Sequence, residues 1–205
     1  MKILAFDPAS FRNLGWAKVT ATESGVNSFA AGTFVTPDIH DVWQAYWHIY
    51  KFVDALVAKE QPDVVVVEKT SSFSSKNSSF IGGQVSQCMG VIFAVCGHYE
   101  TEVEFALPTS VKMTVAGHGK ATKSQIKKSI LHFVNELTGE NVKYSSEHAY
   151  DSVGNILYYL IMHDKVDPLE EFPWLTAKQM KTVEKRKKKC QDTGGLQKTQ
   201  DYTKK

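Results

Sequence analysis

Cysteine is scarce in this chain, and its spacing argues against two kinds of small-protein architecture. Only three cysteines occur among 205 residues, and no two of them form a C-x-x-C pair. An odd, scattered set speaks against a disulfide framework and against a zinc knuckle. Apolar runs are short as well: none approaches the roughly 18–20 residues that cross a bilayer, and the N-terminus has no signal-peptide pattern. We therefore expect a reduced, soluble, cytoplasmic protein with no membrane partner.

Net charge is also nearly absent, but the average conceals two segments of opposite sign. The chain carries 24 Lys+Arg and 22 Asp+Glu, a formal net charge of +2. Residues 1–177 hold 14 basic and 19 acidic residues, whereas residues 178–205 hold 10 and 3, so the two segment charges are −5 and +7. The simplest interpretation of the basic tail is a solvated or disordered run of charge.

Hydrophobic patterns predict a chain of short strands and amphipathic helices. The run DVVVV at 63–67 is continuous and β-branched, which is typical of a strand covered on both faces. From about residue 38 to 60 apolar residues recur every three or four positions, which predicts a helix, and Asp38 after Pro37 is a candidate start. The expected strands are 2–7, 14–21, 26–35, 63–67 and 102–107, and the expected helices are about 38–60, 81–98, 122–137 and 146–163.

The order of these elements, βββαβαβαα, predicts an α/β fold: a mixed five-stranded sheet with helices on both faces. The first three strands would be antiparallel, and the strands that alternate with helices would be parallel. Residues 69–80 are expected to form a serine-rich loop, and Pro108 is expected to end the last strand. We expect a folded domain over residues 1–167 and a basic C-terminal extension over 168–205, for which we consider a helix followed by disorder.

Three acidic residues stand where an unpaired carboxylate is costly. Asp7 ends an apolar strand, and Glu68 ends the most apolar strand of the chain. Asp151 lies on the inner side of an otherwise apolar helix, three residues after His148, so these two share a helix face. Buried carboxylates are generally paired or bind a metal. If the two strands pair in parallel, the four side chains can surround one site suited to Mg²⁺ or Mn²⁺.

Each of these residues also has an ordinary structural interpretation. Asp7 alone could cap a turn, and Glu68 could pair with Lys69 or another base. His148 could be a core histidine with one satisfied ring nitrogen, and Asp151 could face solvent if the helix were rotated. The set of four is more informative than any single member.

Four segments of the chain resemble the RuvC family of Holliday-junction resolvases, which have the RNase H-like fold. The first is ILAFDPASFRNLGWA, which looks like the family's first strand, Asp-Pro-x-Ser turn and second strand. The second is VVVVEKTSSF, which looks like the strand that ends in the second acid. The third is LPTSVKMTVAGHGKATKSQI, and the fourth is EHAYDSVGNIL, which looks like the closing helix with a metal-binding pair three residues apart. His148 would be the histidine variant of a position that holds Asp or His in the family.

The resemblance implies a metal-dependent endonuclease that resolves four-way DNA junctions by paired cuts, leaving 5′-phosphates. It also implies two Mg²⁺ ions, replaceable by Mn²⁺, that activate water and stabilise the leaving oxygen. Family members are homodimers, since paired cuts need two sites related by a two-fold axis. The helix at 81–98 could form that interface or pack on the sheet. The implied catalytic metal ligands are Asp7, Glu68, His148 and Asp151.

Other residues are candidates for contacts with DNA. Lys123 is the best candidate for a catalytic cation near the scissile phosphate, although a solvated lysine in a first helical turn fits equally well. Lys112 and Lys120 are candidate contacts with the DNA backbone. Lys120 directly follows a turn that could itself approach a phosphate. Phe73, in the serine-rich loop, is the candidate for stacking on an unpaired base, worth roughly 1–3 kcal/mol. Phe73 could instead anchor the loop to the core.

Two alternatives use the same fold: a broader branched-DNA or flap endonuclease, and a catalytically silent DNA-binding scaffold. Asp7, Glu68 and Asp151, which we call the acidic set, are all present, and this argues against the silent scaffold. An actin-like ATPase needs paired domains, for which the chain is too short. The basic tail lies outside the resemblance, and its lysines could neutralise DNA phosphates. The compact chain and its loop would suit a phage or viral member, which would act in the host cytoplasm.

Overall fold

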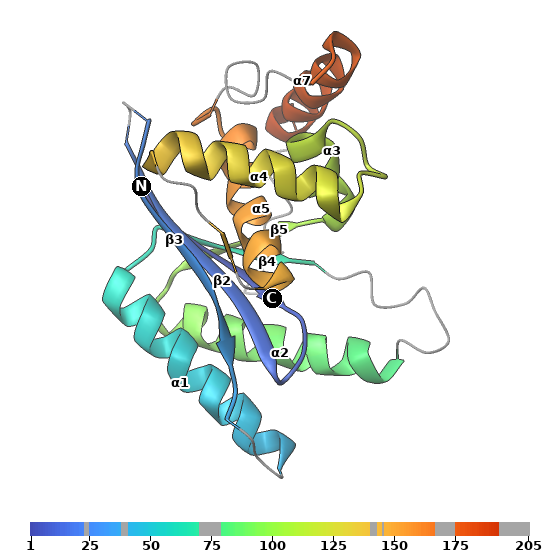
Figure 1. Ribbon diagram of the computed structural model, residues 1–205. Coiled ribbons are helices and arrows are strands. Elements are labelled where there is room, and N and C mark those ends of the chain that lie inside the picture. The colour runs from blue at the N-terminus through green and yellow to red at the C-terminus, as the bar shows by residue number, and fades with distance from the viewer. Residues whose placement is uncertain are drawn as a thin grey trace.

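The computed structural model contains one five-stranded mixed sheet with helices on both faces (Figure 1). No described helix is long and apolar enough to cross a membrane. The structure describes residues 1–22, 25–37, 41–69, 79–139, 143–144, 146–166 and 175–192.

The strands follow the order β3-β2-β1-β4-β5 across the sheet. β1 (Lys2–Pro8) and β2 (Asn13–Thr22) are antiparallel, as are β2 and β3 (Gly25–Val35). β4 (Val64–Glu68) lies parallel to β1, and β5 (Glu102–Ala106) lies parallel to β4. The predicted fold class, an RNase H-like sheet with three antiparallel strands followed by parallel ones, is confirmed.

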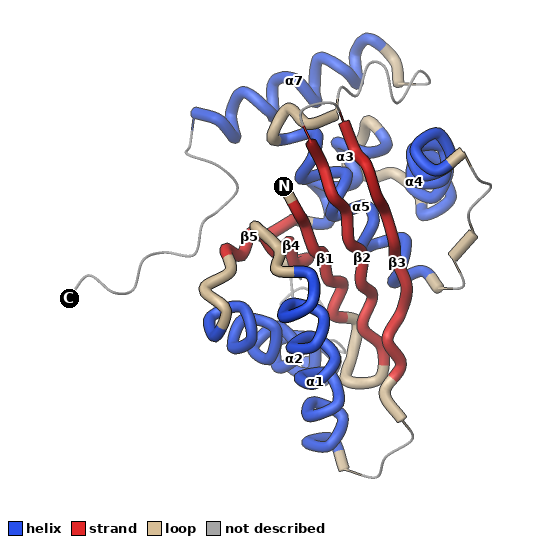
Figure 2. The backbone as a smooth tube through the Cα atoms, turned by 90° about the vertical axis from the view of Figure 1, so that its left-hand side faces the viewer, coloured by secondary structure: helices blue, strands red, loops and turns tan. Residues whose placement is uncertain are grey.

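Side chains alternate along each central strand, so the two faces of the sheet contribute to two separate hydrophobic cores. Val64 and Val66 of β4 face one core, and Val65 and Val67 face the other, which is why this strand is apolar at every position. Figure 2 shows the helices on the two sides of the strands. The first layer contains α1 (Val42–Glu60) and α2 (Ser79–His98), and the second contains α3 (Pro108–Ala116), α4 (Lys123–Thr138), α5 (Glu147–Met162) and α7 (Ala177–Asp192).

Two of these helices differ from the sequence expectation. Pro108 ends β5 as predicted, but it also begins α3, where its fixed φ and missing N–H suit a first helical position. In the basic tail, α7 packs through Met180 and Val183 against the hydrophobic core that it shares with α3, α4 and α5. This part of the tail is therefore not a solvated run of charge. The candidate helix start at Asp38 lies outside the described residues, and the domain boundary at residue 167 stays a prediction.

A glycine of β2 sets how closely α5 approaches the sheet. Gly15 pairs with Asp7 in the register of β1 and β2. A Cβ atom placed on Gly15 would lie 2.2 Å from the carbonyl oxygen of His148 and 2.7 Å from Oγ of Ser152. Only a residue without a side chain therefore lets the first turns of α5 rest on β2 beside Asp7.

Replacing this glycine with a larger residue should displace the first turn of α5 and so destabilise the fold. We expect Gly15→Ala to destabilise the fold by about 1–3 kcal/mol, because overpacking forces backbone shifts. Urea unfolding would measure this. The matched control is Gly97→Ala in α2, where an added Cβ meets nothing within 4 Å and an alanine favours the helix. Equal stability of Gly15→Ala and the native protein would contradict the close approach.

Candidate active site

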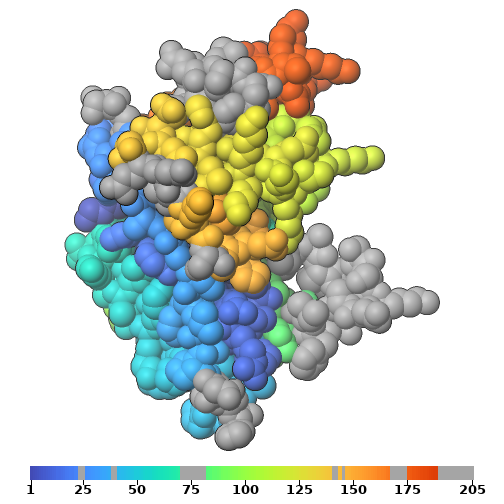
Figure 3. All heavy atoms as spheres, viewed as in Figure 1, coloured from blue at the N-terminus to red at the C-terminus, as the bar shows by residue number. Residues whose placement is uncertain are grey.

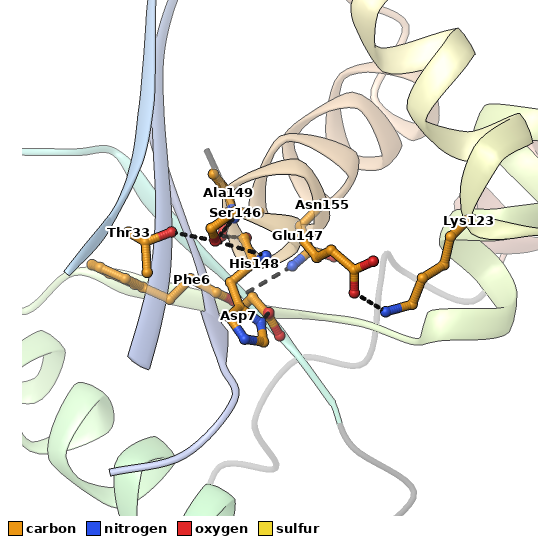
Figure 4. A network of polar contacts seen from close by, with 10 residues as sticks. Phe6, Asp7, Thr33, Lys123, Ser146, Glu147, His148, Ala149 and Asn155 are labelled. Carbon is orange, nitrogen blue, oxygen red and sulfur yellow. Dashed lines mark hydrogen bonds and ion pairs between the residues drawn. The ribbon is translucent and has the colours of Figure 1, made fainter. Parts of the chain in front are cut away.

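The first turn of α5 is fixed by a serine cap and a contact with β3 (Figure 4). Oγ of Ser146 accepts hydrogen bonds from the backbone N–H groups of His148, at 3.1 Å, and Ala149, at 3.4 Å. The same oxygen lies 2.6 Å from Oγ1 of Thr33 in β3. Because the cap satisfies otherwise unpaired N–H groups, the helix begins at a defined residue. The backbone of His148 is therefore held at a fixed place above the sheet.

His148 and Asp7 meet at the end of β1. Nδ1 of His148 lies 2.9 Å from Oδ2 of Asp7, which is only 7% exposed. This hydrogen bond raises the pKa of His148 above its usual value; partial burial of the ring opposes the shift, and the negative charges of Asp7 and Asp151 add to it. The contact orients the imidazole at the carboxyl end of β1.

Asp151, one helical turn after His148, completes a compact group of possible metal ligands. One ligand atom from each of Asp7, His148 and Asp151 lies within 4.8 Å of the others. Burial raises the pKa of Asp151 to about 6, and the charge of Asp7 adds to this shift, while Lys123 and His148 oppose it. A second carboxylate beside Asp7 is thus held in a place where its ionised form is disfavoured.

Glu68 reaches the same edge from β4 but stands outside that tight group. The parallel register pairs Phe6 with Val67, so Asp7 and Glu68 follow side by side at the carboxyl ends of the two strands. The pKa of Glu68 is raised to about 8, mostly by burial and in smaller part by the charges of Asp7 and Asp151, while Lys112 opposes the shift. The carboxyl group of Glu68 therefore feels both of the other acids.

The donor set fits a divalent cation. Three carboxylates and one imidazole converge from three elements, and their mutual repulsion and burial raise two of the carboxyl pKa values. Ionised carboxylates this close are stable only when a positive charge compensates them. Carboxylate oxygens with one imidazole are ligands for a hard or borderline divalent ion such as Mg²⁺ or Mn²⁺.

The candidate DNA-binding residues lie in different surroundings. Lys123, at the start of α4, forms an exposed ion pair with Glu147, and this contact raises the pKa of Lys123. Lys112, in α3, is close enough to Glu68 to lower the pKa of its carboxyl group. Lys120 is exposed on the turn between α3 and α4. Phe73 lies outside the described residues.

A pocket of about 250 Å³ opens beside Asp151, between α4 and the start of α5. Its walls combine basic and aromatic groups. The ammonium group of Lys127 lies 4.6 Å from the ring centroid of Tyr150, and the rings of Tyr144 and Tyr150 meet edge to face. The pocket is lined by Lys123, Ser124, Ile126, Lys127, Tyr144, Ser146, Glu147, Tyr150 and Asp151.

Some residues that build the site were not identified from the sequence. Gly15 and Ser146 position α5, and Nδ2 of the buried Asn155 donates to the carbonyl oxygen of Phe6 at 3.4 Å, which joins α5 to β1. A serine immediately before a predicted helix is a recognisable cap signal. The roles of Gly15 and Asn155 depend on contacts between distant segments, which no local pattern reveals.

Comparisons with known proteins agree with this geometry. The model of the family described as crossover junction endodeoxyribonuclease RuvC matches residues 3–153. The RuvC of Rickettsia typhi is 29% identical over 134 residues, which are 65% of this chain and 83% of that protein. The RuvC of Syntrophomonas wolfei is 31% identical over 126 residues, which are 62% of this chain and 71% of that protein.

Solved structures show the same fold. The structure of Thermus thermophilus RuvC has a TM-score of 0.63 at 18% identity and covers 80% of this chain and 98% of its own. A structure of T. thermophilus RuvC in complex with a Holliday junction substrate has a TM-score of 0.62 at 19% identity, over 77% of this chain and 92% of that one. Since the family model spans residues 3–153 of 205, including every member of the acidic set, this chain belongs to the crossover junction endodeoxyribonuclease RuvC family.

Proposed function

We propose that this protein resolves four-way DNA junctions by metal-dependent hydrolysis of two phosphodiester bonds, leaving 5′-phosphates. The observation that carries the proposal is the convergence of Asp7, His148 and Asp151 within 4.8 Å, with Glu68 beside them, in a RuvC-family chain. The raised pKa values of Glu68 and Asp151 favour this function over a silent scaffold, because a scaffold gains nothing from crowding buried acids.

The metal ligands in this proposal are Asp7, Glu68, His148 and Asp151. Two Mg²⁺ ions, or Mn²⁺ in their place, would lower the pKa of the attacking water and stabilise the leaving oxygen. Asp7 has a second task, because its hydrogen bond to His148 fixes the ring of that ligand. Gly15 and Ser146 keep the first turn of α5 at the distance this arrangement needs.

Lysines beside the acidic set would position the DNA strand. Lys112, near Glu68, and Lys123, near Asp151, can each offer an ammonium group to a phosphate, and phosphoryl transfer depends on such positioning. Lys123 would exchange its ion pair with Glu147 for a phosphate oxygen. The pocket beside Asp151, with Lys127 and Tyr150, has the chemistry to hold the neighbouring nucleotide. Lys120 remains a candidate contact with the DNA backbone, and Phe73 remains the candidate for stacking on an unpaired base at the junction.

Resolution of a junction needs two cuts related by symmetry, so we propose a homodimer as the active form. The exposed small residues Gly83 and Gly90 of α2 would allow two helices to approach closely. DNA as a substrate also implies action in the cytoplasm, or in the host cytoplasm if the gene is carried by a phage.

Substitution of Asp7 tests the proposed function. Asp7→Asn keeps the shape of the side chain but removes its charge, so Mg²⁺-dependent cutting of a synthetic four-way junction should fall by at least about 10³-fold, while junction binding is kept. Single-turnover cleavage with mapped nicks measures this. Asp54→Asn, on a partly buried aspartate of α1 that accepts a hydrogen bond from Tyr99 away from the site, is the matched control and should cut normally.

Two results would contradict this proposal. Cutting by Asp7→Asn at the native rate would remove Asp7 from the metal site. Equal cutting of four-way, three-way and flap substrates by the native protein would favour the broader branched-DNA nuclease.

The charge of Glu68 should make stability depend on pH and on metal. Its pKa is about 8 in the fold and 4.5 as the reference value, so the folded protein retains a proton that the unfolded chain releases. The stabilising contribution is therefore complete below about pH 4.5 and is lost as pH rises to about 8. In EDTA at pH 8.5, Glu68→Gln should be more stable than the native protein by on the order of 1–3 kcal/mol.

Urea unfolding at pH 5 and pH 8.5 measures this difference, which should shrink at the lower pH. Added Mg²⁺ should stabilise the native protein at pH 8.5 and stabilise Glu68→Gln much less. Glu136→Gln, on an exposed glutamate of α4, is the control and should behave as the native protein does. A native protein that is more stable than Glu68→Gln in EDTA at pH 8.5 would refute the proposed strain.

A further inference from the structure

Helix α7 lies outside the region that matches the RuvC family, yet it is built into the fold. The family model ends at residue 153, and α7 covers Ala177–Asp192. It opens with a capping box: Oγ1 of Thr176 accepts from the backbone N–H of Gln179 at 3.3 Å, and Oε1 of Gln179 accepts from the N–H of Thr176 at 2.8 Å. This reciprocal pair is a strong start signal for a helix.

One face of α7 is fully used in packing on the nuclease domain. Met180 is 5% exposed and Val183 is 0% exposed, and both belong to the core beneath α3, α4 and α5. Arg186 donates hydrogen bonds to Oγ of Ser110 and, at 3.3 Å, to Sδ of Met113, both in α3. The helix is therefore held by apolar and polar contacts together.

Among the basic side chains of α7 that the structure describes, two contact the rest of the domain and four do not. Arg186 contacts α3, and Lys187 forms an ion pair with Asp164 after the end of α5. Four other lysines, over the side chains described through residue 188, are exposed, and none of these four has an ion pair with a described residue. Their spacings of three, four and three residues place them within about 80° of one another around the helix. They are Lys178, Lys181, Lys185 and Lys188, which we call the lysine face.

The lysine face points to a polyanion rather than to a membrane. A helix that binds a lipid surface must bury its own apolar side, and that side of α7 is already covered by the domain. From Lys178 to Lys188 the helix rises about 15 Å, a length of duplex DNA that carries about nine phosphate charges. A duplex arm can thus engage all four ammonium groups at once.

The place of α7 in the fold sets which part of the DNA it can reach. The start of α7 rests on the turn that carries Lys120, since a Cβ on Gly117 would lie 2.6 Å from the side chain of Gln179. Its other end contacts Asp164, whereas His148 stands at the opposite end of α5. Sixteen residues of α5 span about 24 Å, or roughly seven base pairs of duplex. Figure 3 shows α7 projecting at the top of the molecule, beside the surface of α3 and α4.

We propose that the lysine face of α7 is a second DNA-binding surface, which grips the phosphate backbone of a junction arm roughly seven base pairs or more from the scissile phosphate. This proposal rests on the proposed function, because the distance from α7 to the scissile phosphate is defined only if the acidic residues around Asp7 cut DNA. The surface adds affinity for duplex DNA of any sequence. The docked face of α7 makes it a rigid arm rather than a loose basic tail.

A pair of charge-removing substitutions tests the surface. Lys181→Gln with Lys185→Gln should lower the magnitude of the slope of log affinity against log salt by about 2 and weaken binding equally for junctions and linear duplexes. The matched control is Lys51→Gln with Lys59→Gln, two exposed lysines of α1 in the other helical layer, which should leave the slope unchanged. An unchanged slope in the α7 pair, or an equal drop in the control pair, would overturn the proposal.

A second variant tests whether the helix must be docked. Val183→Ser keeps all four lysines but loosens the apolar anchor, so junction affinity should fall while the salt slope stays close to native, because ordering the helix then opposes binding. Native affinity in this variant would show a loose tail instead. Circular dichroism would confirm that the variant remains folded.

Phosphate ethylation interference locates the contact, with native protein in Ca²⁺ in place of Mg²⁺. Interference should extend to phosphates roughly seven base pairs or more from the cut, and these outlying signals should vanish in the Lys181 and Lys185 double variant. Interference confined to phosphates at the crossover would overturn the proposal. So would lysine-dependent binding to anionic phosphatidylglycerol vesicles with DNA binding unaffected. Failure of the native protein to cut junctions in Mg²⁺ would instead refute the proposed function.

Discussion

Electrostatic repulsion among three carboxylates at one partly buried edge of the sheet is the constraint on which the rest of this structure depends. Asp7 and Glu68 end adjacent parallel strands, and Asp151 approaches from the helix above them. The pKa values of Glu68 and Asp151 rise to about 8 and about 6, so the fold holds these acids at a cost in stability. Such a cost is typical of functional sites, where a bound cation repays it.

Several contacts hold α5 in position over the edge of the sheet that carries the carboxylates. Gly15 admits the first turn of α5, Ser146 caps it, and Asn155 links the helix to the backbone of β1. Each contact acts on the helix that carries His148 and Asp151, so a small displacement of α5 would separate these ligands from those on the strands. The two layers of helices cover opposite faces of the sheet. α3, α4, α5 and α7 lie on the side of the acidic set, and α1 and α2 pack on the other face.

Much of the fold followed from local patterns, and the remainder depends on contacts between distant segments. The apolar run of β4 predicted a strand buried on both faces, and the spacing of His148 and Asp151 predicted a shared helix face. The helix α3 was missed because a proline that ends a strand can equally begin a helix. The docking of α7 was missed because high charge dominates its composition, while only Met180 and Val183 reach the core. The exact neighbours of Glu68 depend on strand register, which sequence alone does not fix.

Crystals of the protein in Mn²⁺ offer the most direct test of the central claim, because anomalous scattering locates the ion without reference to activity. We expect two anomalous peaks roughly 3.5–4 Å apart, in contact with Asp7, Glu68, His148 and Asp151. The Asp7→Asn protein should lose at least one of them. Absence of any peak at the carboxyl ends of β1 and β4, in crystals that hold Mn²⁺ elsewhere, would contradict the account.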